Sequence, residues 1–366
     1  MEEVLELKKK SDFTHGGNLK EFQNKFSLTK EEIIDFSANI NFLGIPEEVK
    51  EIIKKEIENV IHYPQPQAEN FKEQLSKTIG LNKEKIIAGN GAAELIYLLL
   101  DYLKVNKILL PVPSFSEYEK AAFKIEAELD FFYLKEEKDF SLELLEFEKS
   151  IKGNDLVILN NPHNPTGRLY NRDKLKDILK TAQKEGAFVL IDEAFIDFVR
   201  GNTYSLIKEI NRFDNLFILR SLTKFFAMPG LRLGFALTNN NLVDELEKRR
   251  DPWTVNSLAQ AAGIEALKQK RYIKKTRTAI NKERQFLYEK LKNIKGIKVY
   301  EPSVNFILLR IEKEITAAEL RTKMAKSGII IRDCSNFRGL DNNFVRVAVK
   351  DRKANIRLLN VLKNSL

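Results

Sequence analysis

The sequence predicts an α/β protein, with a mainly parallel sheet flanked by helices in a large domain and a smaller α+β domain after it. Three observations predict this class. The 366 residues exceed what one hydrophobic core usually serves. Through the middle of the chain, short apolar runs typical of strands buried on both faces alternate with amphipathic stretches. Beyond residue 240 this alternation stops. We expect an N-terminal arm at 1–45, the large domain at 46–240 and the small domain at 241–366.

The elements follow from the apolar runs and from the helical periodicity between them. In the large domain we expect strands at 86–88, 107–110, 156–160, 188–192 and 216–220, with helices at 93–103, 115–125 and 172–185. In the small domain we expect helices at 256–293 and 317–327, with strands at 297–300, 305–311, 328–332 and 344–349. Ligands of parallel sheets bind outside the carboxyl ends of the strands, so the residues that follow each run are the candidates for chemistry.

Composition excludes several classes of protein. The net charge of +9 comes from basic residues that are mostly interleaved with acidic ones, which is typical of solvated helix faces, so we expect no nucleic-acid partner. Cys334 is the only cysteine, so no intrachain disulfide can form. The first residues are acidic where a signal peptide would be basic, and no uncharged run approaches the roughly 18–20 residues of a membrane span. We expect a cytoplasmic protein without a membrane segment.

A lysine and an arginine follow the last apolar run of the large domain. Lys224 ends the segment Arg-Ser-Leu-Thr-Lys, and Arg232 comes eight residues later. A desolvated amine can form an imine, while the hydroxyls of Ser221 and Thr223 and a guanidinium can hold a phosphate dianion. Taken alone, Lys224 would more often be a surface lysine in a polar loop.

A glycine-containing loop follows the first run and opens a helix. In Gly-Asn-Gly-Ala-Ala-Glu, the small residues Gly91 and Ala92 beside Asn90 allow backbone N–H groups to approach a phosphate at the positive end of the helix dipole. The loop is not a dinucleotide fingerprint, because Glu94 stands where the third glycine is needed. An ordinary strand–helix turn is an equal alternative.

Three further strand ends carry groups that suit a flat, phosphorylated ring. The loop Asn-Pro-His-Asn-Pro-Thr-Gly at 161–167 presents the amide of Asn164 between two prolines. Asp192 ends a buried run, where a carboxylate is costly unless paired, and a protonated pyridine nitrogen would pair with it. Phe115 could stack on the ring. The alternatives are a helix N-cap for Asp192 and core packing for Phe115.

Together these motifs resemble the fold-type I aminotransferase superfamily of pyridoxal-phosphate enzymes, from about residue 35 to the C-terminus. The resemblance implies that Lys224 is the Schiff-base lysine, that Asp192 pairs with the pyridine nitrogen, that Asn164 bonds the ring 3-oxygen and that Phe115 stacks on the ring. It also implies a phosphate site made by Asn90, Gly91, Ala92, Ser221, Thr223 and Arg232.

Two further positions bear on the resemblance. Tyr63, in His-Tyr-Pro, is similar to a tyrosine that family members lend to the cofactor phosphate of a neighbouring subunit, which implies a homodimer with shared sites. Phe195 is a departure, because many relatives carry at this position a tyrosine that bonds the 3-oxygen. Without that hydroxyl, only Asn164 is expected at the oxygen.

Two subfamilies compete within the superfamily. Histidinol-phosphate aminotransferases share the cofactor motifs, but three features resemble more closely the L-threonine-O-3-phosphate decarboxylases of cobalamin side-chain synthesis. They are the arm segments at 15–18 and 35–41, Trp253 within 251–256, and the segment 331–337. A catalytically silent protein that only binds a partner would be expected to have lost Lys224 or Asp192, and both are present.

A phosphorylated amino acid has a carboxylate and a phosphate, so it needs two anion sites. Arg332 and Arg346 have fork-shaped donors suited to either anion, and His15 could close over the phosphate from the arm. The resemblance adds Gly17 and Asn39 to the substrate site. Strand-end ion pairs are the alternative for the arginines, and an ordered surface turn is the alternative for His15. The choice between L-threonine phosphate and L-serine phosphate stays open, because one methyl group changes binding by only about 1–3 kcal/mol.

Overall fold

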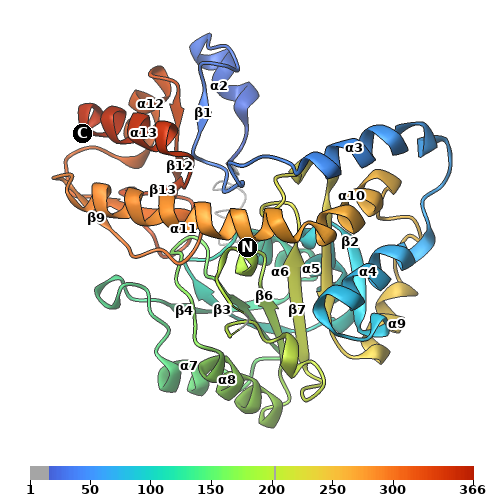
Figure 1. Cartoon of the computed structure of the whole chain (residues 1–366). Coiled ribbons are helices and arrows are strands. Elements are labelled where there is room, and N and C mark those ends of the chain that lie inside the picture. The colour runs from blue at the N-terminus through green and yellow to red at the C-terminus, as the bar shows by residue number, and fades with distance from the viewer. Residues whose placement is uncertain (1–15, 202) are drawn as a thin grey trace.

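The computed structural model of the chain describes residues 16–201 and 203–366. Its centre is a seven-stranded sheet with the order β2-β8-β7-β6-β5-β3-β4 (Figure 1). The strands are β2 (Ile86–Asn90), β3 (Lys107–Val112), β4 (Glu128–Tyr133), β5 (Leu156–Asn160), β6 (Phe188–Asp192), β7 (Leu216–Ser221) and β8 (Leu233–Leu237). β8 runs in the direction opposite to that of the other six strands, which are parallel to one another. The predicted α/β class with a mainly parallel sheet is confirmed.

Helices cover both faces of this sheet, because successive strand residues point to opposite sides. Val189 packs in one hydrophobic core and Leu190 in the other. The first face is covered by α3 (Glu47–Glu56), α4 (Glu69–Ile79), α7 (Leu144–Ser150), α8 (Arg172–Lys184) and α10 (Ser257–Lys268). The second face is covered by α5 (Ala92–Leu103), α6 (Glu117–Lys124) and α9 (Asn240–Glu247).

A second sheet has four strands in the order β12-β13-β10-β9. The long helix α11 runs across the molecule and reaches this sheet with its C-terminal half (Figure 1). The elements of this part are α11 (Lys270–Lys292), β9 (Ile297–Val299), β10 (Phe306–Ile311), α12 (Ala317–Lys326), β11 (Ile329–Ile330), β12 (Arg332–Asp333), β13 (Phe344–Ala348) and α13 (Arg352–Ser365). They share a core of their own, to which Phe36 also belongs.

Two predicted elements are divided in the structure, and the strands β4 and β8 were not predicted. The helix expected at 256–293 is divided at Gln269, whose backbone is not helical, because α10 packs against α3 and α4 whereas α11 departs toward the second sheet. The strand expected at 328–332 is also divided, because its two halves pair with different partners. β11 pairs with β1 (Ile34–Asp35), and β12 pairs with β13.

Residues 34–41, which were predicted to be part of an arm, connect the two sheets. β1 pairs with β11, and the carbonyl of Phe36 accepts a hydrogen bond from the backbone N–H of Ala348 at 2.8 Å. Farther along, the backbone N–H of Asn41 donates to the carbonyl of Lys224 at 3.0 Å. A short helix, α2 (Leu19–Phe26), precedes this segment and packs on α12 through Phe22. This part of the arm is therefore held next to Lys224.

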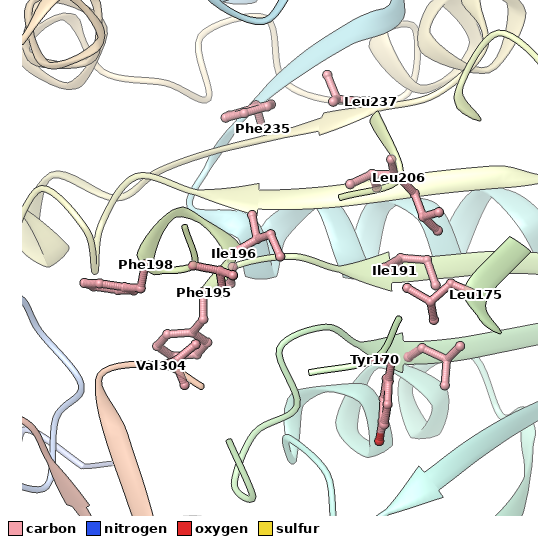
Figure 2. Packing of buried hydrophobic residues seen from close by; sticks show 14 of the residues in the cluster. Tyr170, Leu175, Ile191, Phe195, Ile196, Phe198, Leu206, Phe235, Leu237 and Val304 are labelled. Atoms are coloured by element: carbon pink, nitrogen blue, oxygen red, sulfur yellow. The ribbon is translucent and has the colours of Figure 1, made fainter. Parts of the chain in front are cut away.

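Buried apolar side chains fill the space below the carboxyl edge of the large sheet. Figure 2 shows Ile191 of β6 beside Leu175, and Phe195 near Ile196 and Val304, all members of one core cluster. The ring of Phe195 also contacts Phe306 of the second sheet, with centroids 5.0 Å apart. Within the described ranges, no helix combines the length and the apolar character that a membrane crossing requires.

Candidate active site

The predicted cofactor residues lie at one edge of the seven-stranded sheet. Asn90, Asp192 and Ser221 are the last residues of β2, β6 and β7, and Asn164 lies in the loop after β5. β8 begins at this same edge because it runs antiparallel, so Arg232, the residue before it, also reaches the site. Strand direction alone thus brings these side chains together.

Lys224 is partly buried three residues after the end of β7. Its Nζ lies 3.3 Å from the Oγ of Ser221 and 5.6 Å from the centre of the Phe195 ring. Burial lowers the pKa of the amine, and the positive charge of Arg232 lowers it further, while Asp192 opposes the shift. A lowered pKa favours the neutral amine, which is the form that reacts with a carbonyl group.

The Asp192 carboxylate is buried and receives two hydrogen bonds. The hydroxyl of Tyr118 donates to Oδ2 at 2.6 Å, and the backbone N–H of Ala194 donates to Oδ1 at 2.8 Å. Burial raises the pKa of Asp192, whereas the hydrogen bond from Tyr118 and the charge of Lys224 act against this rise. Asp192 therefore presents a carboxyl group at the edge of the sheet that has no ion pair with an arginine or lysine among residues 16–201 and 203–366.

A group of polar donors lies at the ends of β2 and β7, on either side of β8. Gly91 has a φ of +80°, and a side chain there would collide with the guanidinium of Arg232. The hydroxyls of Ser221 and Thr223 are 2.8 Å apart on the other side, and the N-terminus of α5 begins at Ala92. Free N–H groups of a helix start, two hydroxyls and a guanidinium fit a phosphate dianion.

The loop before α5 has fewer N–H groups available for a phosphate than the sequence predicted. The backbone N–H of Asn90 already donates to the carboxylate of Glu94, and the N–H of Gly91 donates to the carbonyl of Gly89 at 2.8 Å. The first turn of α5, starting at Ala92, keeps N–H groups without an intrahelical partner. The expected phosphate donors are therefore those of α5, and Gly91 serves by leaving room for Arg232.

A methyl group at Gly91 is expected to weaken cofactor binding. Gly91→Ala forces a non-glycine residue into a left-handed conformation, at about 1–3 kcal/mol, and pushes Arg232 aside. We expect the Kd for pyridoxal phosphate to rise about tenfold or more when the apoprotein is titrated. Gly80→Ala is the matched control, because Gly80 has a φ of +71° and open space around it. Equal Kd values for the two variants would contradict the assignment.

The two candidate substrate arginines face each other across β12 and β13. Arg332 pairs with Arg346 in the strand register, and both side chains are buried. Arg346 donates through Nη1 to the Oδ1 of Asn164 and through Nη2 to the carbonyl of Ser37 at 3.3 Å, while Arg332 donates to the Oδ1 of Asn336 at 2.8 Å. Burial lowers the pKa of Arg346 to about 10, and the nearby Arg332 contributes.

Neither arginine has a carboxylate within ion-pair distance among the described residues, so the alternative of strand-end ion pairs is wrong for this part of the chain. The Nε of Arg346 is buried and has no hydrogen-bond partner there. Buried charges are normally paired, and two adjacent guanidinium groups without an acid are typical of an anion-binding site.

The arm residues lie beside this pair as far as the structure describes them. The backbone N–H of Gly17 donates to the Oγ of Ser37 at 2.9 Å, and Ser37 in turn accepts from Arg346. Asn39 is buried, and its Oδ1 has no partner among the described residues. His15 lies outside the described residues. The structure thus brings Gly17, Asn39 and Arg346 into one region.

Three positions discussed in the sequence analysis remain, namely Phe115, Tyr63 and Phe195. The ring of Phe115 meets that of Tyr118 edge to face at 5.7 Å. Tyr63 is 81% exposed and stacks on Trp253 at 4.6 Å. Phe195 has no hydroxyl to offer, and its ring lies against the amine of Lys224. The sequence reasoning missed Tyr118, although its place three residues after Phe115 puts it on the first turn of a helix at the site.

Comparison with known proteins agrees with this geometry. The family model for class I and II aminotransferases matches residues 31–362. A protein of Caldanaerobacter subterraneus subsp. tengcongensis, provisionally named threonine-phosphate decarboxylase, is 40% identical over 98% of this chain and 96% of its own. The threonine-phosphate decarboxylase of Salmonella typhimurium is 32% identical over 96% of each chain.

Among solved structures, the histidinol-phosphate aminotransferase from Clostridium acetobutylicum matches with a TM-score of 0.86 and 38% identity, covering 91% of this chain and 98% of that one. Relatives of both names therefore align over nearly the whole chain. The resemblance seen in the motifs is confirmed, and the fold and the family agree on the cofactor. The chain belongs to the class I and II aminotransferase family, whose fold-type I members use pyridoxal 5′-phosphate.

Proposed function

We propose that this protein decarboxylates L-threonine O-3-phosphate to (R)-1-aminopropan-2-yl phosphate and CO2, in cobalamin side-chain synthesis in the cytoplasm. The observation that carries the proposal is the pair of buried guanidinium groups of Arg332 and Arg346, which has no acidic partner among the described residues. The substrate carries a carboxylate and a phosphate in one small molecule, so two adjacent forks of donors suit it.

The cofactor residues would act as follows. Bound pyridoxal phosphate supplies a ring that accepts the electron pair of a bond broken next to an amine. Lys224 would hold the cofactor covalently through its amine, and Asp192 would keep the ring nitrogen protonated. Ser221, Thr223 and the start of α5 would bind its phosphate together with Arg232. Asn164, held by Arg346, would donate from its Nδ2 to the ring 3-oxygen.

The protein chooses the bond that breaks by orienting the substrate. Residues that hold the substrate carboxylate in the position for cleavage would favour loss of CO2, because the bound cofactor would accept the electron pair of the bond that breaks. Arg332 and Arg346 would fix that orientation by binding the two anions. A proton would replace the carboxylate on Cα, and Lys224 in its ammonium form is the proposed donor because its side chain lies at the site, with Nζ 3.3 Å from the Oγ of Ser221.

The runner-up is a histidinol-phosphate aminotransferase, which the similarity to the Clostridium acetobutylicum enzyme supports. The decarboxylase is favoured by the relative at 40% identity, by the arm segments and by residues 331–337. Both activities fit the cofactor site, because they would differ in which bond of Cα the substrate-binding residues present for cleavage.

One pair of assays separates the two reactions. The holoenzyme is incubated with L-threonine O-3-phosphate, with CO2 measured, and separately with histidinol phosphate and 2-oxoglutarate, with glutamate measured. We expect CO2 and no glutamate. Glutamate without CO2 would exclude the decarboxylase. L-serine O-phosphate, run in parallel, tests whether the pocket distinguishes the methyl group, which we expect to change kcat/KM by about 10- to 100-fold.

We also propose a homodimer with shared active sites. An exposed apolar surface follows α3 on the 3-10 turn η1 (Ile57–Ile61), where Ile61 is 79% exposed. It continues through Tyr63 to Trp253, which is 43% exposed. Adjacent exposed apolar side chains typically mark a protein interface, and Tyr63 would then reach the neighbour's cofactor phosphate.

The dimer is expected to depend on this surface. Ile61→Glu places a charge in the apolar patch, so we expect sedimentation equilibrium to show a dimer for the native protein and a monomer for the variant. Leu145→Glu is the control, because Leu145 is 74% exposed on α7 without belonging to the patch. A native protein that sediments as a monomer at micromolar concentration would contradict the proposal.

A further inference from the structure

A chain of buried polar groups leads to Asp192 across three neighbouring strands. Ser114 follows β3, Asn160 ends β5 and Asp192 ends β6, and these strands are adjacent in the sheet. Asn160 and Asp192 are partners in the strand register. Tyr118 extends from the first turn of α6 into the space beside them and is fully buried. None of these three companions of Asp192 was expected from the sequence.

The hydrogen bonds that link these polar groups all point toward Asp192. The Oγ of Ser114 donates to the Oδ1 of Asn160 at 3.1 Å, and the Nδ2 of Asn160 donates to the Oη of Tyr118. The phenol has a single hydrogen, which it donates to the Oδ2 of Asp192 at 2.6 Å. If the Asn160 amide were turned the other way, its oxygen would take that hydrogen and Oδ2 would lose its donor.

This direction decides which form of Asp192 is favoured. Tyr118 and Lys224 are the titratable groups that interact with the carboxylate, and both stabilise its charged form against burial. Burial and the nearby Asp192 raise the pKa of Tyr118 well above its usual value of 10, so the phenol keeps its hydrogen at neutral pH. Tyr118 therefore acts as a permanent donor.

We propose that Tyr118 is a positioning residue that keeps Asp192 charged and correctly oriented for the ring nitrogen of the cofactor, with the Nδ2 of Asn160 donating to Tyr118 so that the phenol hydrogen is left for Asp192. The inference rests on the proposed role of Asp192. The edge of the Tyr118 ring also contacts Phe115 at an interplanar angle of 85°, so one side chain supports both the nitrogen partner and the stacking residue.

The test uses holoenzyme reconstituted with cofactor that carries ¹⁵N in its ring, because the ¹⁵N chemical shift reports whether the nitrogen is protonated. In Tyr118→Phe we expect the shift to move toward that of a neutral pyridine and the cofactor Kd to rise about tenfold, the effect of one hydrogen bond to a charged group. Tyr97→Phe is the matched control. It removes a hydroxyl that donates to Glu117 at 3.0 Å, and we expect a native shift and Kd.

Two further variants make the result decisive. Asn160→Asp introduces a carboxylate that competes for the hydrogen of Tyr118, so it should move the ¹⁵N signal in the same direction even if Tyr118→Phe fails to fold. Asp192→Asn gives the change in ¹⁵N chemical shift that is expected when the carboxylate beside the ring nitrogen is lost completely. If Asp192→Asn moves the signal and the Tyr118 and Asn160 variants do not, the inference is overturned while the role of Asp192 stands. If Asp192→Asn leaves the signal unchanged, that role and the inference both fail.

Discussion

Lys224→Ala is expected to remove the visible absorption of the purified protein and to lower kcat for CO2 release by at least about 10⁴-fold. The substitution removes at once the amine that would bind the cofactor covalently and the proposed proton donor for Cα. Lys224 differs from Lys72, which is also buried but forms an ion pair with Glu69 at 2.6 Å. Within the described residues Lys224 has no ion pair, and its Nζ contacts the Oγ of Ser221.

Lys224→Arg is the matched control for charge. The guanidinium keeps a positive group near Ser221 and Asp192 but does not form the imine, so we expect the same loss of colour and of activity. Absorption spectra and CO2 release are measured on the same preparations. A variant that releases CO2 within tenfold of the native rate would show that the covalent role belongs to another residue.

Arg346→Gln is expected to lower kcat/KM for L-threonine phosphate by about 10²- to 10⁴-fold, since two charge-assisted hydrogen bonds of about 1.5–3 kcal/mol each are lost. The substitution has two effects, because Arg346 is both a proposed anion ligand and the partner that orients the Asn164 amide. Arg346→Lys keeps the charge but not the fork, and we expect it to recover little.

Arg352→Gln is the control for this result. Arg352 holds Glu283 with two hydrogen bonds at 2.8 and 3.1 Å on a more exposed surface, so its loss should change kcat/KM less than threefold. Arg332→Gln, tested beside Arg346→Gln, assigns the anions. Loss of the carboxylate ligand should leave binding of the product 1-aminopropan-2-yl phosphate unchanged, whereas loss of the phosphate ligand weakens it. Native kinetics in both variants would contradict the proposed substrate site.

The residues predicted for the cofactor site meet at one edge of the sheet because most of them end or follow a buried strand. Apolar runs mark the strands, parallel strands share one carboxyl edge, and so Asp192, Asn164 and Lys224 had to meet. Arg232 was noticed from its spacing after Lys224, but the strand that positions it was not predicted. β8, which carries it to the edge, was not recognised as a strand, although it is buried along its whole length.

Other parts of the site could not be predicted because they depend on contacts distant in sequence. The hydrogen bond from Tyr118 to Asp192 joins a helix to a strand end far along the chain, and a buried tyrosine has the same apolar signature as any core residue. Likewise, the polar segment at 34–41 has the composition of a loose arm. This segment is held in place by its pairing with β11 and by the hydrogen bond to the carbonyl of Lys224. Local propensity cannot predict these contacts, because the partners are distant in sequence.

The antiparallel strand β8 has a consequence for how the anion site is assembled. β8 lies between β2, from an early part of the chain, and β7, from a much later part. Asn90 of β2 is opposite Leu233 of β8, and Ser221 of β7 is opposite Gly234 of β8. The donors of α5 lie on one side of β8, and the donors that follow β7 lie on the other side. Phosphate affinity is therefore a property of the completed sheet, and a fragment that lacks either side contains only half of the site.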